Sequence, residues 1–496
     1  MHFFEYLTHP KLLGHAGLMI PLTIQAALLH PYYQQNVTSS VVRRSLIPIA
    51  VIMAFVTAPM RKWLPLEDSM MVNFCFVSLV TFHATCLAFE YGLHEGPVLG
   101  PKCELEEVEL SGEENHTSIS PEDLIKSQSI GTTEARKRTN NHASTDGETK
   151  STTMTGDSSE SNVKNSPTKK KEQLVKPSTG ELVRFVLWLL FSPRGLECQW
   201  APHPSIVTFR KPISTSTFIL RETLGRVFVL HAYGTVCWAL ATCAFHHPQG
   251  FYGIIKDVTG LSESSVIKFF AGYGTSFCIG ACMWTGLEIA AAGMNLFEFL
   301  LYSIGRRFLP VSWAPEKPFN PRRYPPLFSK PWESKSMSEF WGRGWHALFR
   351  RDLTFCGALP AFKLAAMLGF GKQVQKLSGL MGAMFLSGLM HEYAIASISW
   401  EKTGPQIIFF FMECAIVMAV ENLIEKHTKI RFKGIWGTIW TFGFLMYFGK
   451  PGLDLCGAGV KFFSLLDLHT LVGDAFGGTS EALQYQAGPV EGQYQR

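Results

Sequence analysis

Residues 224–245 read LGRVFVLHAYGTVCWALATCAF, and the only charged residue in this run is Arg226. A helix needs about 20 mostly apolar residues to cross a bilayer. Comparable runs recur along the chain, so the sequence predicts an all-α, polytopic transmembrane helical bundle with about eight to ten spans. The expected spans are residues 12–29, 46–58, 70–89, 224–245, 266–292, 354–370, 377–399, 407–423 and 435–448, and shorter interfacial or re-entrant runs are expected at 299–309 and 462–472.

The charged residues divide the chain into two kinds of segment. The whole chain is 47% hydrophobic and 17% charged, whereas soluble proteins carry about 25% charged residues. Residues 101–180 contain 11 Lys/Arg and 14 Asp/Glu but no Phe, Trp or Tyr, and such a segment cannot bury enough apolar area to fold. We therefore predict N-terminal transmembrane helices at 1–100, a disordered cytosolic insert at 101–180, a second membrane domain at 181–475 and a C-terminal tail at 476–496.

Net charge and cysteine spacing exclude other classes of protein. The formal charge of +5 divides into +8 outside the insert and −3 within it, which is too small a surplus for a nucleic-acid-binding protein. The 11 cysteines are scattered and show no metal-binding or disulfide spacing, so no metal site is predicted. The first apolar run begins near Leu12 without a basic segment before it, which indicates a first span rather than a cleavable signal peptide.

Loop charges predict how the bundle is oriented. Residues 310–353 carry 8 Lys/Arg against 4 acidic residues, and Arg43, Arg44 and the insert fall on the same side of the predicted membrane. The positive-inside rule places that side in the cytosol. Residues 182–191 are too short to span and are expected to form an interfacial helix. Several predicted spans contain polar groups that must face a partner or a watery cavity: His83, His231, Glu288, His391, Glu392 and Glu413.

The loop at 310–353 contains the first stretch whose side chains are suited to catalysis or binding. Residues 336–346 read SMSEFWGRGWH, and Ser336 or Ser338 is expected to cap a short helix. Aromatic rings and cations gather at membrane boundaries, so one interpretation is an interfacial anchor. The other is a functional site that contains Trp341, Arg343 and His346.

The second stretch lies in the middle of an apolar helix, where residues 387–393 read SGLMHEY. Neutral histidine is the usual general base near pH 7, and apolar surroundings disfavour its charged form. Ser387 lies four residues before His391 on the same helix face and can orient the ring, whereas Glu392 points about 100° away around the helix. The alternative is a structural histidine that is bonded to a neighbouring helix.

Together these stretches resemble a known family. The elements YPPLF (324–328), SMSEFWGRGWH and SGLMHEY, with 45 residues from His346 to His391, resemble the wax-synthase-like branch of the membrane-bound O-acyltransferases. The closest likeness is to fungal members that act in terpenoid and other secondary-metabolite pathways. The resemblance covers roughly residues 190–450. It departs from the family pattern at Gly344, where arginine is common, and after Arg194-Gly195, where Leu196 stands in place of isoleucine.

The resemblance implies an acyl-CoA-dependent O-acyltransferase that esterifies a lipophilic alcohol in the endoplasmic reticulum membrane, most simply by acetyl transfer to a terpenoid. Residues 181–475 would form the catalytic membrane domain. His391 would be the general base and His346 the second polar residue of the centre. Acyl-CoA would be a co-substrate, with no permanently bound cofactor. The residues expected to bind substrates are Trp341, Arg343, Trp345, Ser387, Glu392, Arg350 and Arg351, with Arg322, Arg323 and Lys330 as further candidates for the CoA phosphates.

Other interpretations remain open at this point. Within the enzymes, the alternative is a long-chain wax-ester or sterol-ester synthase. A membrane transporter would use the intramembrane His and Glu residues for substrate or proton passage, but the sequence contains no internal repeat of spans. A catalytically silent binding protein is a third possibility. Residues 142–147 match the His-x-x-x-Asp-Gly signature of soluble acyltransferases, but they lie in the predicted disordered insert, so we attribute this match to chance.

Overall fold

The computed structural model of the chain consists of helices and connecting segments throughout its described residues, with no strand among them, which confirms the all-α prediction. Four stretches of the described chain are long and apolar enough to cross a membrane: Val37–Ala54, Thr215–Ala244, Ser265–Phe308 and Gln406–Thr428. The larger count of eight to ten spans remains a prediction. The structure describes residues 10–57, 79–95, 176–190, 213–308, 319–321, 324–346, 348–399 and 405–459.

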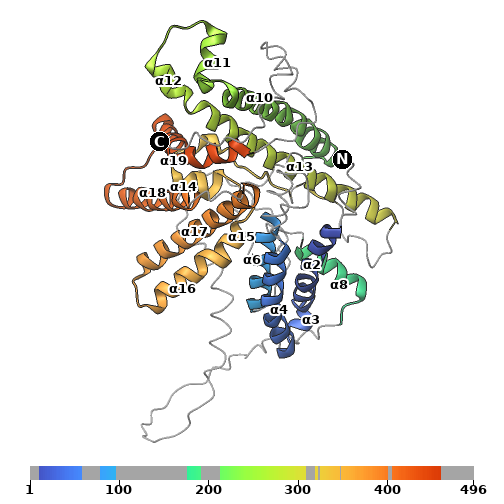
Figure 1. Ribbon diagram of the computed structural model, residues 1–496. Helices are drawn as coiled ribbons and strands as arrows, with labels where there is room; N and C mark the ends of the chain where they lie inside the picture. Colours follow the sequence, from blue (N-terminus) through green and yellow to red (C-terminus); the bar gives the residue numbers. More distant parts are fainter. Residues whose placement is uncertain are drawn as a thin grey trace, which may run out of the picture.

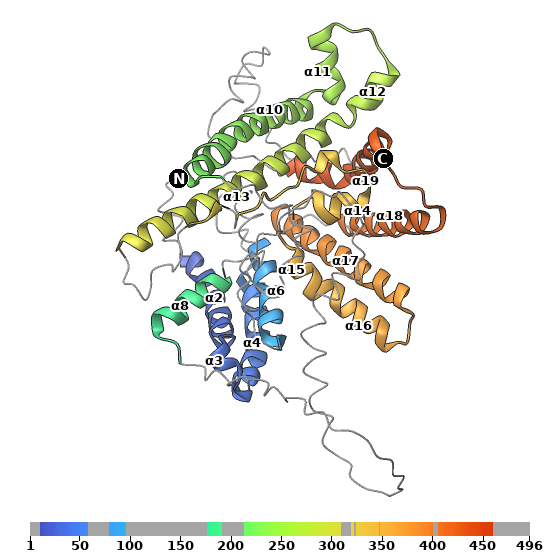
Figure 2. The same ribbon diagram turned by 180° about the vertical axis from the view of Figure 1, so that it is seen from behind.

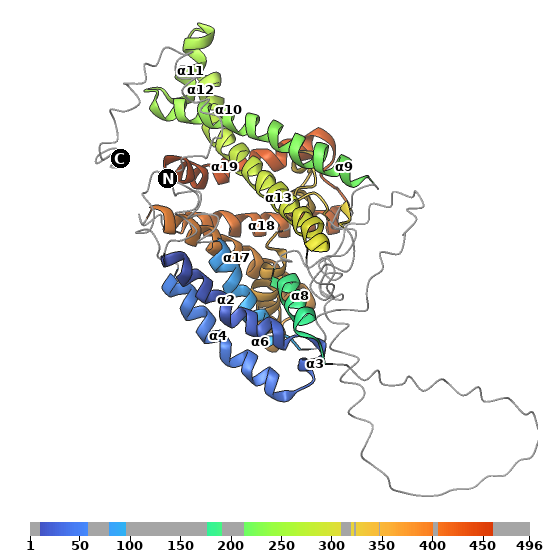
Figure 3. The ribbon, with the colours of Figure 1, turned by 90° about the vertical axis from the view of Figure 1, so that its right-hand side faces the viewer.

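Three antiparallel helices form an N-terminal bundle, with α8 (Thr179–Leu190) packed on their side (Figures 1 and 3). They are α2 (Pro10–Leu28), α4 (Val37–Thr57) and α6 (Val80–Leu93), with the short α3 (Pro31–Gln34) between the first two. The buried amide of Gln25 donates to the carbonyls of Arg43 at 2.8 Å and Ala88 at 3.2 Å. A polar group in an apolar bundle needs such partners, and these bonds tie all three helices together.

Arg43 closes the end of α6. Its guanidinium donates to the carbonyl oxygens of Tyr91 and His94, and the residue is only 2% exposed. The last carbonyls of a helix have no partner within the helix, and a cation is favourable there. The charge of Arg43, which the positive-inside rule predicts on the cytosolic side, thus also has a structural role.

The short α8 begins with a reciprocal cap. Ser178 N–H donates to the carboxylate of Glu181 at 2.7 Å, and Glu181 N–H donates to the Ser178 hydroxyl at 3.3 Å. This pair is a capping box. The phenol of Tyr91 donates to the carbonyl of Leu189 at 3.0 Å and joins α8 to α6. With 12 residues, α8 is too short to span, as predicted.

A second layer consists of two long helical segments that pack against each other (Figure 2). The first segment comprises α9 (Thr215–Thr217), η2 (Phe218–Gly225) and α10 (Arg226–His246). The second is α13 (Gly274–Phe308). The short helices α11 (Gly250–Thr259) and α12 (Ser265–Ala271) connect the two. Arg226 pairs with buried Glu288 at 2.8 Å, so this intramembrane carboxylate has the partner that its position required. Residues 299–308 continue α13, which corrects the expectation of a separate short helix: no Gly-Pro break interrupts the run.

The third part contains the helices that carry the candidate site. The segment α15 (Arg350–Asp352) continues through η6 (Leu353–Ala358) into α16 (Leu359–Met367), which packs against α17 (Lys372–Ser399). The helices α18 (Gln406–Thr428) and α19 (Gly434–Gly459) follow, and α17 lies between η6 and α18 (Figures 1 and 2). A Cβ on Gly388 would lie 2.8 Å from Cα of Ile408. This glycine therefore permits close contact between α17 and α18.

Several predictions concern residues outside the described ranges. These are most of the insert at 101–180, of which only 176–180 are described, the first half of the span at 70–89, the apolar run at 462–472 and the tail at 476–496.

Candidate functional site

The SMSEFWGRGWH motif folds into a short capped helix, as predicted. Ser336 is the N-cap, and its hydroxyl accepts from Glu339 N–H at 3.0 Å. The carboxylate of Glu339 in turn accepts from Lys335 N–H at 2.9 Å. The helix comprises α14 (Met337–Glu339) and the π-helical turn η5 (Phe340–Gly344). Such turns occur often at functional sites.

Glu421, in the second half of α18, holds this helix in place. Its carboxylate accepts from the backbone N–H of Met337 at 2.9 Å and Ser338 at 3.1 Å, from the Ser338 hydroxyl at 3.3 Å, and from the indole N–H of Trp440 at 2.9 Å. Glu421 is 6% exposed. Our sequence reasoning missed this residue, although an acidic residue within an apolar helix was the signal that could have identified it.

The YPPLF element packs directly on the motif helix. The ring of Phe328 lies 4.9 Å from Trp345 and 5.6 Å from His346, edge-on to both. A Cβ on Gly344 would come within 2.6 Å of the Ser334 hydroxyl oxygen and 3.2 Å of Pro331 Cα. The packing thus leaves little space for a side chain at this position, where the family that the sequence resembles often has arginine.

His391 is held in one defined orientation. Its Nδ1 lies 2.7 Å from the carbonyl oxygen of Ser387. Because a carbonyl only accepts, Nδ1 carries the hydrogen, and Nε2 of the neutral ring is left as the basic nitrogen. The predicted orientation by Ser387 thus comes from its backbone and not from its hydroxyl. The carboxylate of Glu392 accepts from the N–H of Ile407, at the start of α18, at a distance of 3.3 Å. It is therefore turned toward α18 and not toward Nδ1 of His391, as its position around the helix predicted.

Aromatic contacts connect the two candidate histidines. The ring of His391 lies 4.8 Å from Phe411, and Phe411 lies 5.3 Å from Trp341. Trp341 lies 6.2 Å from Trp345, which lies 5.7 Å from His346. The structure therefore joins both motifs in one aromatic cluster, which comprises His391, Phe411, Trp341, Trp345 and His346.

The basic residues near the motif have different environments. Arg350 donates to the carbonyl of Gly342; burial lowers the pKa of Arg350 to about 10, so it stays a cation at neutral pH. Arg351 donates to both carboxylate oxygens of Glu90, at 2.8 and 2.6 Å, and both side chains are 5% exposed. Arg343 is exposed and lies 4.0 Å from Glu339. Lys330 is exposed and pairs with Glu333, whereas Arg322 and Arg323 lie outside the described residues.

One polar face of α6 meets the segment that follows the motif. His83, Cys86 and Glu90 are spaced three and four residues apart and so share a helix face. Nδ1 of His83 lies 2.6 Å from a carboxylate oxygen of Asp352, Glu90 pairs with Arg351, and the Cys356 thiol lies 3.7 Å from the Cys86 carbonyl. The sequence predicted that His83 needs a polar partner, but it did not predict that this partner is Asp352.

These features define a multi-pass helical membrane protein with a polar, aromatic centre. Residues 324–412 match the model of the Membrane bound O-acyl transferase family. This segment contains both candidate histidines and all three motif elements, and the match confirms the resemblance that the sequence suggested.

Individual relatives support the same resemblance. The chain is 24% identical over 274 residues to acetyltransferase ple2 of Rhodocybe pseudopiperita, covering 54% of this chain and 64% of that protein. It is 25% identical over 128 residues to probable long-chain-alcohol O-fatty-acyltransferase 8 of Arabidopsis thaliana (25% and 37%). It is 23% identical over 155 residues to acyl-CoA–sterol O-acyltransferase 1 of the same plant (31% and 44%). The matched parts thus span less than two thirds of these curated relatives.

Proposed function

We propose that this protein is an acyl-CoA-dependent O-acyltransferase that esterifies a lipophilic alcohol. The observation that carries the proposal is the oriented His391 ring, whose basic Nε2 belongs to a cluster that also contains His346. A base held by a hydrogen bond to its other nitrogen is a recurrent arrangement for activating a hydroxyl. The family match and the names of the relatives support the same reaction class.

The chemistry follows from the properties of these side chains. Nε2 of His391 accepts the hydroxyl proton as the alcohol oxygen attacks the thioester carbonyl carbon. The tetrahedral oxyanion needs an N–H donor, for which His346 and Trp345 are the candidates. The carbon–sulfur bond then breaks, CoA leaves as the thiolate, and the imidazolium returns its proton to the sulfur. The products are an ester and CoA.

The donor that we favour is acetyl-CoA, because a fungal relative matched over the longer stretch is named an acetyltransferase. Long-chain acyl transfer is the second candidate, supported by the names of the plant relatives. Exposed Arg343, at the proposed cytosolic boundary, is the candidate cation for the CoA phosphates. Arg350 is a further candidate, although its guanidinium donates to the Gly342 carbonyl. An apolar acceptor would enter from the bilayer, and we place the protein in the endoplasmic reticulum membrane.

The test is CoA release by microsomes that contain the full chain. Acetyl-CoA and palmitoyl-CoA are each offered with a panel of terpenoid, sterol and long-chain alcohols. We expect an ester to form with at least one pair, and His391→Ala to lower turnover by about 10²–10⁴-fold without loss of expression. His427→Ala, at the end of α18, is the control. Full turnover by the His391 variant, or no ester from any pair with folded protein, would overturn the proposal.

A further inference from the structure

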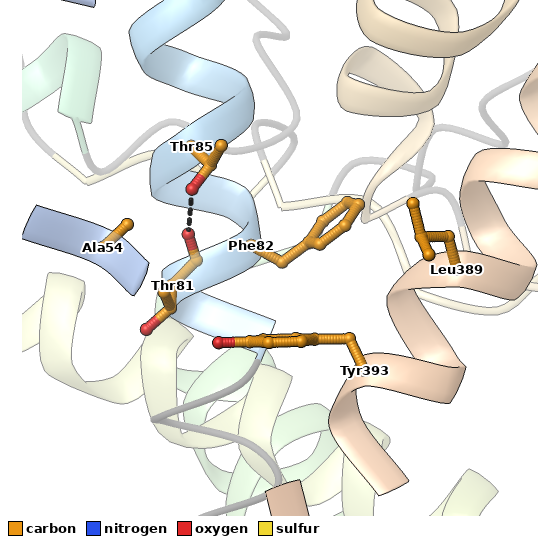
Figure 4. A pocket seen from close by; sticks show the side chains of 6 residues that line it. All are labelled: Ala54, Thr81, Phe82, Thr85, Leu389 and Tyr393. Carbon is orange, nitrogen blue, oxygen red and sulfur yellow. Dashed lines mark hydrogen bonds between the residues drawn. The ribbon is translucent and has the colours of Figure 1, made fainter. Parts of the chain in front are cut away.

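The pocket between α6 and α17 has no charged group in its walls. Its volume is about 130 Å³, and its lining is almost entirely apolar. Figure 4 shows the ring of Phe82 pointing from α6 toward Leu389, and the ring of Tyr393 reaching from α17 toward α6. The lining residues are Ala54, Thr81, Phe82, Thr85, Leu389 and Tyr393. The side chains that are suited to recognise a further ligand lie instead where α18 passes into α19.

The loop between α18 and α19 is strongly basic. Residues 426–433 read KHTKIRFK, and their exposed cations are Lys426, Lys429, Arg431 and Lys433. Arg431 pairs with Glu425, whereas the three lysines make no ion pair within the described part of the chain. Four cations thus accompany one carboxylate, so the loop has a surplus of positive charge that an anion would compensate.

This loop lies at the membrane boundary, at the same end of the bundle as the start of the motif helix. The helix α18 is long and apolar enough to span, and it ends at Thr428. A Cβ on Gly437, in the first turn of α19, would lie 2.5 Å from the carbonyl oxygen of Lys335, which precedes the N-cap Ser336. Figures 1 and 2 show α14 beside α18. The positive-inside rule predicts the cytosolic side for this end.

Exposed apolar side chains accompany these lysines. Ile430 is 67% exposed, Ile435 is 66% exposed and Trp436 is 76% exposed. Tryptophan is enriched where a span meets the headgroups, and lysine keeps its ammonium group in water while its stem lies along apolar surface. Cations beside exposed apolar side chains fit the surface of a lipid leaflet better than a small soluble anion, which offers nothing for Ile430 and Trp436 to contact.

Lys429 adopts a backbone conformation that favours glycine. It is the C-cap of α18 with a φ of 59°, and its N–H donates to the carbonyl of Glu425 at 2.9 Å. Glycine is the usual residue in such a left-handed turn because it has no Cβ. A lysine there lowers stability, and unfavourable backbone conformations of this kind gather at functional sites. This observation favours a binding role for Lys429.

We propose that this loop binds the headgroup of an anionic phospholipid of the cytosolic leaflet, with Lys426, Lys429 and Lys433 around the phosphate. Ile430 and Trp436 lie in the interface beside it. Anionic lipids concentrate in that leaflet, and each juxtamembrane lysine strengthens their attraction by about fivefold. The loop lies outside residues 324–412, which match the family, and the lipid is not a substrate. Binding there does not depend on the proposed function.

Two contacts connect the loop to the motif helix. Phe432 stacks on Trp440, with ring centroids 5.6 Å apart and planes 10° from parallel. The indole N–H of Trp440 donates to Glu421, which also accepts from Met337 N–H. A lipid that orders the loop would therefore also stabilise the first turn of the motif helix.

The first experiment measures binding through the melting temperature. The purified full-length protein in detergent is titrated with short-chain phosphatidylserine or short-chain phosphatidylcholine, because a ligand that binds the folded state raises this temperature. We expect a saturable rise with phosphatidylserine and none with phosphatidylcholine. Lys429→Gln with Lys433→Gln should weaken the apparent affinity for phosphatidylserine by about 25-fold.

The control removes the same charge elsewhere in the chain. Lys256, on α11, and Lys268, on α12, lie outside this loop, and Lys268 precedes exposed Phe269. Lys256→Gln with Lys268→Gln should change the affinity for phosphatidylserine by less than about twofold. Equal weakening by the two double variants, or an equal response to the two lipids, would overturn the proposal.

Lys429→Gly gives a test with two opposite signs. Glycine relieves the left-handed conformation, so the melting temperature without lipid should rise. The same variant lacks one cation, so its affinity for phosphatidylserine should fall by about fivefold. An unchanged affinity would contradict the binding role of Lys429.

Soluble phosphates test whether a lipid is the ligand. The same titration is made with CoA and with inorganic phosphate. We expect any response to CoA to be equal in the unmodified protein and in the Lys429→Gln, Lys433→Gln variant, and inorganic phosphate to leave the phosphatidylserine response in place at constant ionic strength. A CoA response that this variant loses would assign the loop to a soluble phosphate compound and overturn the proposal of a lipid.

Hydrogen exchange tests the connection to the motif helix. We expect phosphatidylserine to slow amide exchange at Met337 and Ser338 in the unmodified protein. Trp440→Phe keeps a ring beside Phe432 but removes the indole N–H, so it should bind the lipid and lose this protection. Protection that persists in Trp440→Phe would overturn the connection through Glu421 and leave the lipid site standing.

Discussion

The carboxylate of Glu421 lies 2.9 Å from the backbone nitrogen of Met337, a residue 84 positions earlier in the chain. A buried carboxylate is costly unless hydrogen bonds compensate its charge, and this one receives bonds from two backbone N–H groups, a hydroxyl and an indole. The bonds fix the first turn of the motif helix to α18, which also carries Phe411. Glu421 therefore positions the motif helix relative to His391. We assign it this positioning role and no contact with the reacting atoms.

We predict that Glu421→Ala will lower both stability and turnover. Removal of the acceptor leaves buried donors unpaired, and each costs about 1–3 kcal/mol. The expected result is a clearly lower melting temperature in detergent and a lower kcat. Glu421→Gln, which keeps one acceptor oxygen, should restore part of both.

The control for this prediction lies one turn further along the same helix. Glu425 pairs with Arg431 at the surface, so Glu425→Gln should change the melting temperature little. An equal loss in the two glutamine variants would contradict a specific role for Glu421.

The pair between His83 and Asp352 predicts a strong energetic coupling. Asp352 is almost fully buried, and its oxygen lies 2.6 Å from the imidazole. A double-mutant cycle with His83→Ala and Asp352→Asn should give a coupling energy of about 1–3 kcal/mol in unfolding experiments. Because Phe349 packs between His83 and His346, turnover should fall as well.

The chain contains a matched comparison for this cycle. Nε2 of His247 lies 3.0 Å from a carboxylate oxygen of Asp257, but Asp257 is 67% exposed. The same cycle there should give a coupling below about 1 kcal/mol. Equal couplings for the two pairs would mean that burial does not strengthen the His83–Asp352 contact.

How much of the fold the sequence predicts depends on how far apart in the chain the residues lie that determine each feature. Apolar runs are local, so the positions of α2, α10, α17 and α18 followed from composition, and Ser336 followed from the spacing of a helix cap. Helix ends were less predictable: α4 begins at Val37 although its apolar run begins near residue 46, because a polar first turn extends the helix.

The contacts that assemble the site were not predictable, because they join residues far apart in the chain. Arg351 illustrates this: a basic residue in a cytosolic loop suggested a phosphate ligand, yet its guanidinium is paired with Glu90, 261 positions away. Ser387 illustrates a second reason. Its position relative to His391 followed from helix geometry, but whether the hydroxyl or the carbonyl bonds the ring depends on rotamers that the sequence does not specify.

The ion pair between Arg351 and Glu90 predicts that removing one partner will destabilise the protein more than removing both. Removing one partner of a buried pair leaves an uncompensated charge, at a cost of about 3–5 kcal/mol. Glu90→Leu should therefore destabilise the protein strongly, and the double variant Glu90→Leu with Arg351→Met should recover much of the loss. The measurement is the melting temperature in detergent. No recovery in the double variant would indicate that the pair stabilises the fold through more than charge compensation.

Gly388 predicts that the site depends on the spacing between α17 and α18. A methyl group at this position would lie 2.8 Å from Cα of Ile408 and 3.4 Å from Cβ of Phe411, so Gly388→Ala must push α18 and the Phe411 ring away from His391. We expect a lower melting temperature and lower turnover. Gly293, on α13, has nothing within 4 Å of such a methyl group, so Gly293→Ala should be neutral or stabilising by up to about 1 kcal/mol, because alanine is the better helix former. Opposite signs for the two substitutions would support close packing at Gly388; a stabilising Gly388→Ala would contradict it.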